Sequence, residues 1–203
     1  LFRSESICDF RLFSCRDGHI VNFNGMGGNG GYSEKSFTIP AELGSLVYLE
    51  KLEFFNNAYI TGEIPPELGN LSNLETLYIY LAGGPGLTGE IPKELGQLSS
   101  LKNLTFVWTK GLTGGIPSEL GNLSSLEKLW LENPGPLSGE LPIELWNLTN
   151  LERLYISDTY LLGTIPKDLE KLSSLKELWL ISNEFNFLFS TVDWSRSEER
   201  RVG

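Results

Sequence analysis

The chain has 203 residues, of which 40% are hydrophobic and 21% are charged, and its formal net charge is -10. This composition supports a buried core, while the negative charge argues against a protein that grips nucleic acid or an anionic membrane. No apolar run is long enough to span a bilayer. With one histidine, His19, and two cysteines, Cys8 and Cys15, the chain excludes a Cys/His zinc cluster and any histidine-dependent triad built without His19.

The first 45 residues hold both cysteines and a glycine-rich run, GMGGNGG, at residues 25–31. This run lacks the Lys-Ser/Thr pair of a phosphate-binding loop, so we interpret it as a flexible loop. His19 has no companion nucleophile or metal ligand in the sequence, and we expect neither a cofactor nor a metal ion. The chain begins at Leu1 without a visible signal peptide, which we interpret as a fragment or a processed form.

A repeat organises the region that follows. A leucine opens each unit at spacings of 25, 27, 25, 25 and 24 residues, and an Ile-Pro or Leu-Pro pair recurs in the same phase. The opening leucines are Leu46, Leu71, Leu98, Leu123, Leu148 and Leu172. Five full units cover residues 46–171, and a sixth fades near residue 187. Because one unit cannot bury its own leucines, the units must stack into a solenoid.

Each unit predicts a short strand, a turn and an outer segment. Leu129, Trp130 and Leu131 alternate in, out and in, which is the period of a strand. Equivalent strands, forming one parallel sheet, are predicted at 52–54, 77–79, 104–106, 154–156 and 178–180. Glycines are expected where the coil turns, at Gly62, Gly89, Gly114, Gly139 and Gly163. The xELGxL segment suits a short helical turn, and the proline and glycine of every unit argue against a bundle of amphipathic helices.

The last eight residues, RSEERRVG at 196–203, match no position of the repeat. They resemble a translated sequencing adaptor, and the alternative is a solvated charged tail. We therefore expect residues 188–203 to be a truncated end with an artefactual tail, and the natural protein to continue beyond about residue 195.

The repeat resembles the plant-type leucine-rich repeat, whose signature is LxGxIPxxLGxL. The segment 87–96, LTGEIPKELG, carries the match, and the resemblance covers residues 20–186. It implies an α/β repeat fold: a right-handed leucine-rich repeat solenoid with a parallel β-sheet on the concave face and short helical turns on the convex face. Residues 46–187 form the repeats in this interpretation, and residues 1–45 form an N-terminal cysteine cap with a first irregular coil.

The N-terminus is similar to the CxWxxVxC cap that precedes such repeats, with Phe10 at the tryptophan position. Residues 18–23 resemble the first strand of that cap. The resemblance implies a disulfide between Cys8 and Cys15, and with it an extracellular or cell-surface location in the secretory pathway. Two free thiols in a cytosolic protein are the alternative.

Four asparagines stand in Asn-x-Ser/Thr and are candidate glycosylation sites: Asn70, Asn103, Asn122 and Asn147. At three of them the motif is also the repeat consensus. Asn103 differs, because it lies beside a strand of the concave face.

The repeat departs from the family in its ladder asparagine, which is present as Asn57 and Asn183. The matching positions elsewhere are Ala82, Thr109, Pro134 and Thr159. Extra residues follow several strands, so the local shape of those coils is not fixed by the family pattern. The first repeats of polygalacturonase-inhibiting proteins are similarly irregular.

Two outward columns of the strands predict the binding face. One column reads Glu53, Tyr78, Thr105, Trp130, Tyr155 and Trp179; the next reads Phe55, Tyr80, Val107, Glu132, Ser157 and Ile181, with Trp108 one residue on. Lys51, Lys128 and Arg153 flank them. Tryptophan and tyrosine are enriched at binding hot spots, so we expect a ligand surface here. The alternative is that the aromatic residues only stack on one another as good strand formers.

These features favour a non-catalytic module that recognises a protein or peptide. By resemblance, the parent is the ectodomain of a receptor-like protein or kinase, or a secreted repeat protein; contact with a membrane would come only through a segment outside this sequence. Alternatives are a secreted inhibitor of cell-wall-degrading enzymes such as polygalacturonase, and an ice-binding protein. Ice binding requires flat ranks of small polar side chains, which the outward columns do not supply.

Overall fold

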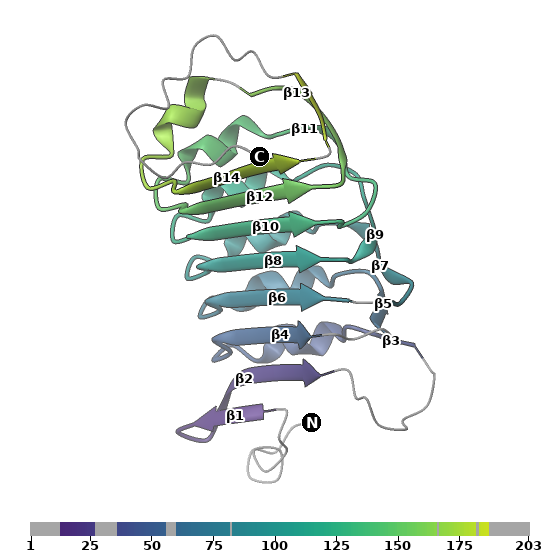
Figure 1. Cartoon of the computed structure of the whole chain (residues 1–203). Coiled ribbons are helices and arrows are strands. Elements are labelled where there is room, and N and C mark those ends of the chain that lie inside the picture. Colours follow the sequence, from purple (N-terminus) through teal and green to yellow (C-terminus); the bar gives the residue numbers. More distant parts are fainter. Residues whose placement is uncertain are drawn as a thin grey trace.

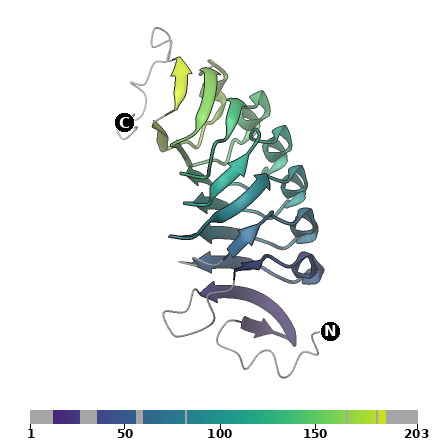
Figure 2. The same cartoon turned by 90° about the vertical axis from the view of Figure 1, so that its right-hand side faces the viewer.

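The computed structural model describes residues 13–26, 36–55, 60–81, 83–165, 167–181 and 183–186. Within these ranges the chain winds through successive coils, each contributing one strand to a large sheet (Figure 1). The stack bends, with the large sheet on its inner side and the short helices on its outer side (Figure 2). The predicted solenoid with a concave parallel sheet is therefore confirmed.

The large sheet has eight strands. In spatial order they are β1 (Phe13–Arg16), β2 (His19–Met26), β4 (Lys51–Phe55), β6 (Thr76–Tyr80), β8 (Asn103–Val107), β10 (Lys128–Glu132), β12 (Arg153–Ser157) and β14 (Glu177–Ile181). β1 runs antiparallel to β2, and all later neighbours are parallel. From β4 to β14 the register never shifts, so equivalent residues of successive units lie side by side.

Two smaller sheets are formed by the short strands that follow the strands of the large sheet along the chain. One contains β3 (Phe37–Thr38), β5 (Ile60–Gly62), β7 (Gly86–Glu90) and β9 (Lys110–Thr113); the other contains β11 (Ser138–Glu140), β13 (Tyr160–Thr164) and β15 (Glu184–Asn186). The sequence did not predict these strands, because they are short and four of them, β5, β7, β11 and β13, contain turn glycines. The five predicted turn glycines all have positive φ, between 74° and 103°, so their role in turning the coil is confirmed.

Short 3-10 helices form the outer side. They are η1 (Ala41–Ser45), η2 (Pro66–Asn70), η3 (Lys93–Gln97), η4 (Ser118–Asn122), η5 (Ile143–Asn147) and η6 (Lys167–Lys171). Each of the first five follows a proline with extended ψ, whose carbonyl accepts the first bond of the turn, as from Leu68 N to Pro65 O at 3.1 Å. The predicted helical turns are confirmed, and they are of the 3-10 type.

The glycine of xELG lets neighbouring turns approach closely. A Cβ atom on Gly69 would lie only 2.4 Å from the carbonyl oxygen of Glu94 in the next turn. In the fourth unit, in η5, Trp146 takes this place and is buried, 1% exposed. η6 contacts η5 far less than other neighbouring turns contact each other, and in Figure 1 the yellow-green turn stands apart from the turns below it. The indole therefore widens the convex side at the last described coil.

The core is a continuous stack of leucine and isoleucine side chains, almost all fully buried. Leu129 and Leu131 are buried on either side of a half-exposed Trp130, as the alternation predicts. At this scale of burial, the solenoid is stabilised mainly by apolar contacts between successive coils.

Threonine hydroxyls replace the ladder asparagine. Thr109 Oγ1 donates to the carbonyl oxygen of Pro134 in the next coil at 3.0 Å. Thr159 Oγ1 donates to Asn183 Oδ1, and Asn183 Nδ2 donates to Ile156 O at 2.9 Å. The irregular column thus keeps its bonds between coils.

Several predictions fall outside the described residues. Cys8 and Phe10 of the cap, the ladder positions Asn57 and Ala82, and the tail at 196–203 belong to this group. Cys15 lies on β1, and its pairing with Cys8 stays a prediction. Residues 18–23, predicted as the first cap strand, form the turn and the beginning of β2.

Candidate ligand-binding face

The two outward columns are in register across the sheet. Tyr78, Thr105 and Trp130 are paired in successive strands, and Tyr155 and Trp179 follow. The sheet therefore places every predicted aromatic residue of the strands on one face.

The aromatic surface is not continuous, however. Thr105 is 2% exposed and Val107 is 7% exposed, although both were expected to point into solvent. The register sets Thr105 between the larger residues Tyr78 and Trp130, which accounts for its burial. β8 thus separates two aromatic clusters.

The first cluster consists of Phe55, Tyr78 and Tyr80. The Phe55 ring centroid lies 6.1 Å from that of Tyr78 and 5.4 Å from that of Tyr80. Phe55 is 50% exposed, so part of this cluster is open to a partner. Burial, and then the neighbouring Tyr80 and Glu53, raise the pKa of Tyr78 above its usual value.

The second cluster is a ladder formed by Trp130, Tyr155 and Trp179. Successive ring centroids are 4.6 and 5.1 Å apart, close to the separation of neighbouring strands, about 4.8 Å. The rings cover one another's faces, so this ladder presents mainly ring edges to the concave side. For these three residues, mutual stacking does occur as the alternative interpretation expects.

The cations beside the ladder are already engaged. Lys128 Nζ lies 4.1 Å from the Trp130 ring centroid, a cation–π contact, and burial lowers the pKa of Lys128, with a further lowering from Arg153. Arg153 Nε donates to Glu177 Oε1 at 3.1 Å. Lys128 therefore offers its charge from a partly desolvated position, while Arg153 would have to exchange Glu177 for a ligand.

The indole N–H groups of the ladder differ. Trp130 Nε1 donates to Glu132 Oε2 at 2.9 Å. Trp179 Nε1 is buried and finds no hydrogen-bond partner within the described part of the chain. An unpaired buried donor is costly, so an acceptor supplied here would be favourable.

Trp108 lies apart from both clusters. It follows β8, is 41% exposed and has φ of +58°, the left-handed conformation that bulky residues rarely adopt. Lys110 Nζ lies 5.5 Å from its ring centroid. Trp108 thus belongs to the edge of the sheet at the carboxyl ends of the strands.

The candidate glycosylation sites divide as expected. Asn70, Asn122 and Asn147 are exposed at the ends of η2, η4 and η5, on the outer side. Asn103 is the first residue of β8 and is half-buried on the concave side. Their modification stays a prediction.

Other kinds of site find little support in the described residues. No group of three or more histidine, cysteine, aspartate or glutamate side chains could hold a metal ion there. None of the helices in these ranges has the length and apolar character needed to cross a bilayer.

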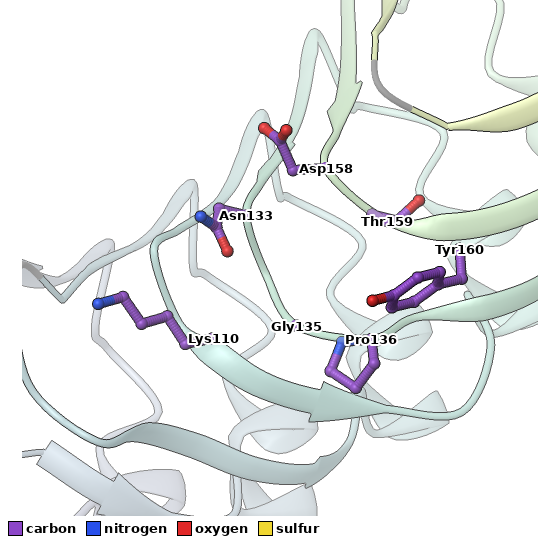
Figure 3. Close-up of a pocket in the computed structure, with 7 residues that line it drawn as sticks. All are labelled: Lys110, Asn133, Gly135, Pro136, Asp158, Thr159 and Tyr160. Atoms are coloured by element: carbon purple, nitrogen blue, oxygen red, sulfur yellow. The ribbon is translucent and has the colours of Figure 1, made fainter.

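Sequence reasoning missed one feature. A cavity of about 400 Å³ opens at the carboxyl ends of β8, β10 and β12, beside the smaller sheets (Figure 3). Its residues include Lys110, Asn133 and Asp158, all with positive φ. The only available signal was the extra residues after the strands, which break the repeat.

Comparison with protein families identifies the class. A model described as "Leucine-rich repeat region" matches residues 32–157, and one described as "Leucine Rich Repeat" matches residues 150–172. The chain belongs to the leucine-rich repeat family. No curated protein sequence matches it significantly.

Solved structures with the same fold include plant proteins. The crystal structure of a TDR receptor is 34% identical, with a TM-score of 0.67, over 80% of this chain and 27% of that one. The Arabidopsis receptor kinase HAESA, in complex with the peptide hormone IDA and the co-receptor SERK1, is 25% identical, with a TM-score of 0.59, over 88% and 33%. A plant ice-binding protein is 26% identical, with a TM-score of 0.72, over 88% and 55%. The chain thus spans only part of the length of each, and its fold is that of plant receptor ectodomains.

Proposed function

We propose that this chain is the recognition part of an extracellular leucine-rich repeat protein, either a receptor-like ectodomain or a secreted protein, and that it binds a peptide on its concave face. The observation that carries the proposal is a rigid parallel sheet with two aromatic clusters on one face. The similarity to a receptor kinase that binds a peptide hormone supports it. The role is non-catalytic, because the chemistry of the face is aromatic contact and charge pairing.

The first cluster is the primary contact. Phe55 offers exposed ring surface beside the partly buried Tyr80, whereas the faces of Tyr155 are covered by its neighbours. Lys128 supplies a cation at the edge of the second cluster that is nearer the first, in register between Asn103 and Arg153. A peptide with an apolar or aromatic side chain near an acidic one matches this arrangement.

Selection from a displayed library of short random peptides on the purified chain tests the proposal. Calorimetry then compares selected peptides on the wild type, on Phe55→Ala and on the outer-turn control Glu94→Ala. We expect Phe55→Ala to weaken binding about tenfold or more and Glu94→Ala to leave it unchanged. Binding that is lost only in Glu94→Ala would place the site on the convex side and contradict the proposal.

The extracellular location rests on the proposed Cys8–Cys15 disulfide and on the exposed Asn70, Asn122 and Asn147. Thiol labelling of secreted, denatured and non-reduced protein should find no reactive cysteine. Two labelled thiols would reject the disulfide.

Ice binding is a second candidate because of the similarity to the plant ice-binding protein. Thermal hysteresis of the purified chain separates the two functions. Its absence, together with peptide binding, is the outcome expected from the mixture of aromatic and charged residues in the concave columns.

A further inference from the structure

A groove separate from the concave face lies where β8, β10 and β12 end. Figure 3 shows the side chains of Lys110, Asn133 and Asp158 in a row along one side, with Tyr160 across from them beside Pro136. The cavity holds about 400 Å³, within the range of small-molecule sites, roughly 300–1,000 Å³.

The shape of the groove is fixed by its backbone. Lys110, Asn133 and Asp158 have φ of +59°, +45° and +57°, and only asparagine and aspartate adopt this region easily. A Cβ atom on Gly135 would lie 2.4 Å from Leu112 O, so the glycine is required where its coil passes the preceding one. The groove is therefore pre-formed, and a ligand would not have to order it.

The backbone of the groove has no spare donors at four of its positions. The N–H groups donate within the solenoid from Lys110 to Asn133 O, from Asn133 to Ser157 O, from Asp158 to Ile181 O and from Tyr160 to Leu137 O. An extended peptide that adds to a sheet needs free backbone groups, as does a phosphate held by N–H groups. The four engaged N–H groups therefore disfavour these two ligand classes.

The side chains offer recognition instead. Neither Lys110 nor Asp158 forms an ion pair within the described ranges. Their opposite charges make the groove neutral as a whole, which disfavours an anion. Asn133, between them in Figure 3, adds both a donor and an acceptor, and this polar row disfavours a purely apolar ligand.

An aromatic face completes the groove. Tyr160 is 60% exposed and stacks on no other ring among the described residues. A neutral sugar ring has an apolar C–H face to lie on an aromatic ring, and hydroxyls around its edge that both donate and accept. We propose that this groove binds a neutral oligosaccharide, with Tyr160 as the stacking platform and Asn133, Asp158 and Lys110 bonding to hydroxyls.

Isothermal titration of the full chain with neutral oligosaccharides of glucose, mannose, xylose and N-acetylglucosamine tests this site, with oligogalacturonate as the anionic arm. We expect saturable binding of at least one neutral sugar, weakened about tenfold or more by Tyr160→Ala and by Asp158→Asn. Asp158→Asn keeps a residue that accepts positive φ, and Phe55→Ala is the matched control that removes an exposed ring from the concave face. Circular dichroism confirms that each variant folds.

Three outcomes would overturn the proposal. The first is that no neutral sugar saturates the chain at millimolar concentration. The second is that the wild type and Tyr160→Ala bind the sugar equally well. The third is that only oligogalacturonate binds and that Lys110→Gln abolishes this binding. The peptide-binding proposal fails or stands independently, because its variants lie on another face.

Discussion

The ring of Tyr155 lies face to face with the ring of Trp130, with their centroids 4.6 Å apart and their planes inclined by 22°. Its other face is covered by Trp179 at 5.1 Å. Both faces of the Tyr155 ring are therefore used in stacking within the protein, and only the ring edge is open to a ligand. A loss of binding in a Tyr155 variant must be compared with the change in the free energy of unfolding of that variant.

Tyr155→Ala should lower the free energy of unfolding by about 1–3 kcal/mol, because it removes two stacked pairs worth about 0.5–1.5 kcal/mol each. Urea denaturation followed by circular dichroism measures this change. Tyr160→Ala is the matched control, since its exposed ring stacks on no described neighbour, and it should change stability by less than about 0.5 kcal/mol. Equal losses in the two variants would show that the ladder contributes nothing.

Gly69→Ala should destabilise the chain by about 1–3 kcal/mol, because the new Cβ would lie 2.4 Å from Glu94 O and force η2 and η3 apart. Gly115→Ala is the control: its Cβ would meet Ser138 O at an ordinary 3.4 Å, and the melting temperature should barely move. An equal fall in the melting temperature for both variants would show that the close approach of the turns is not the cause, because the entropy effect of Gly→Ala on the unfolded chain is stabilising.

Trp146→Gly would restore the residue found in the earlier units, yet it should destabilise the chain. The indole is 1% exposed and fills the space between η5 and η6, and deleting a buried tryptophan side chain costs about 3–5 kcal/mol where the site cannot collapse. Thermal unfolding of Trp146→Gly and Trp146→Phe should give the larger loss for glycine. A more stable glycine variant would show that η6 closes onto η5.

The sequence predicted the strands and outer turns because a leucine column and an Ile-Pro pair repeat in phase, and both act within one coil. It did not predict the burial of Thr105, which depends on the sizes of Tyr78 and Trp130 in the neighbouring coils. The alternation along a strand predicts which side chains face the concave side, but it does not predict how much of each side chain is exposed.

The groove beyond the strands escaped sequence reasoning for a different reason. In the sequence, Asn133 and Asp158 cannot be distinguished from other loop residues. Their positive φ, and the close approach of Gly135 to the preceding coil, are seen only in the structure. Insertions that break a repeat carry no periodicity, so their geometry follows from contacts between coils and not from local pattern.

Raising the pH should cost stability through Tyr78. Burial, then repulsion from Tyr80 and Glu53, raises the pKa of Tyr78 above its ordinary value in the folded chain, which is about 10. Below about pH 10 this phenol is neutral in both the folded and the unfolded chain, and its contribution to stability is fully present. As the pH rises further, the unfolded chain loses the proton first, so the contribution falls and is gone above the folded pKa. The unfolding free energy of the wild type should therefore drop relative to that of Tyr78→Phe as the pH rises above about 10. Repeating the series at high salt is the control, because burial persists while repulsion between charges is screened. A constant difference between the two proteins across this range would show that Tyr78 titrates as it does in the unfolded chain.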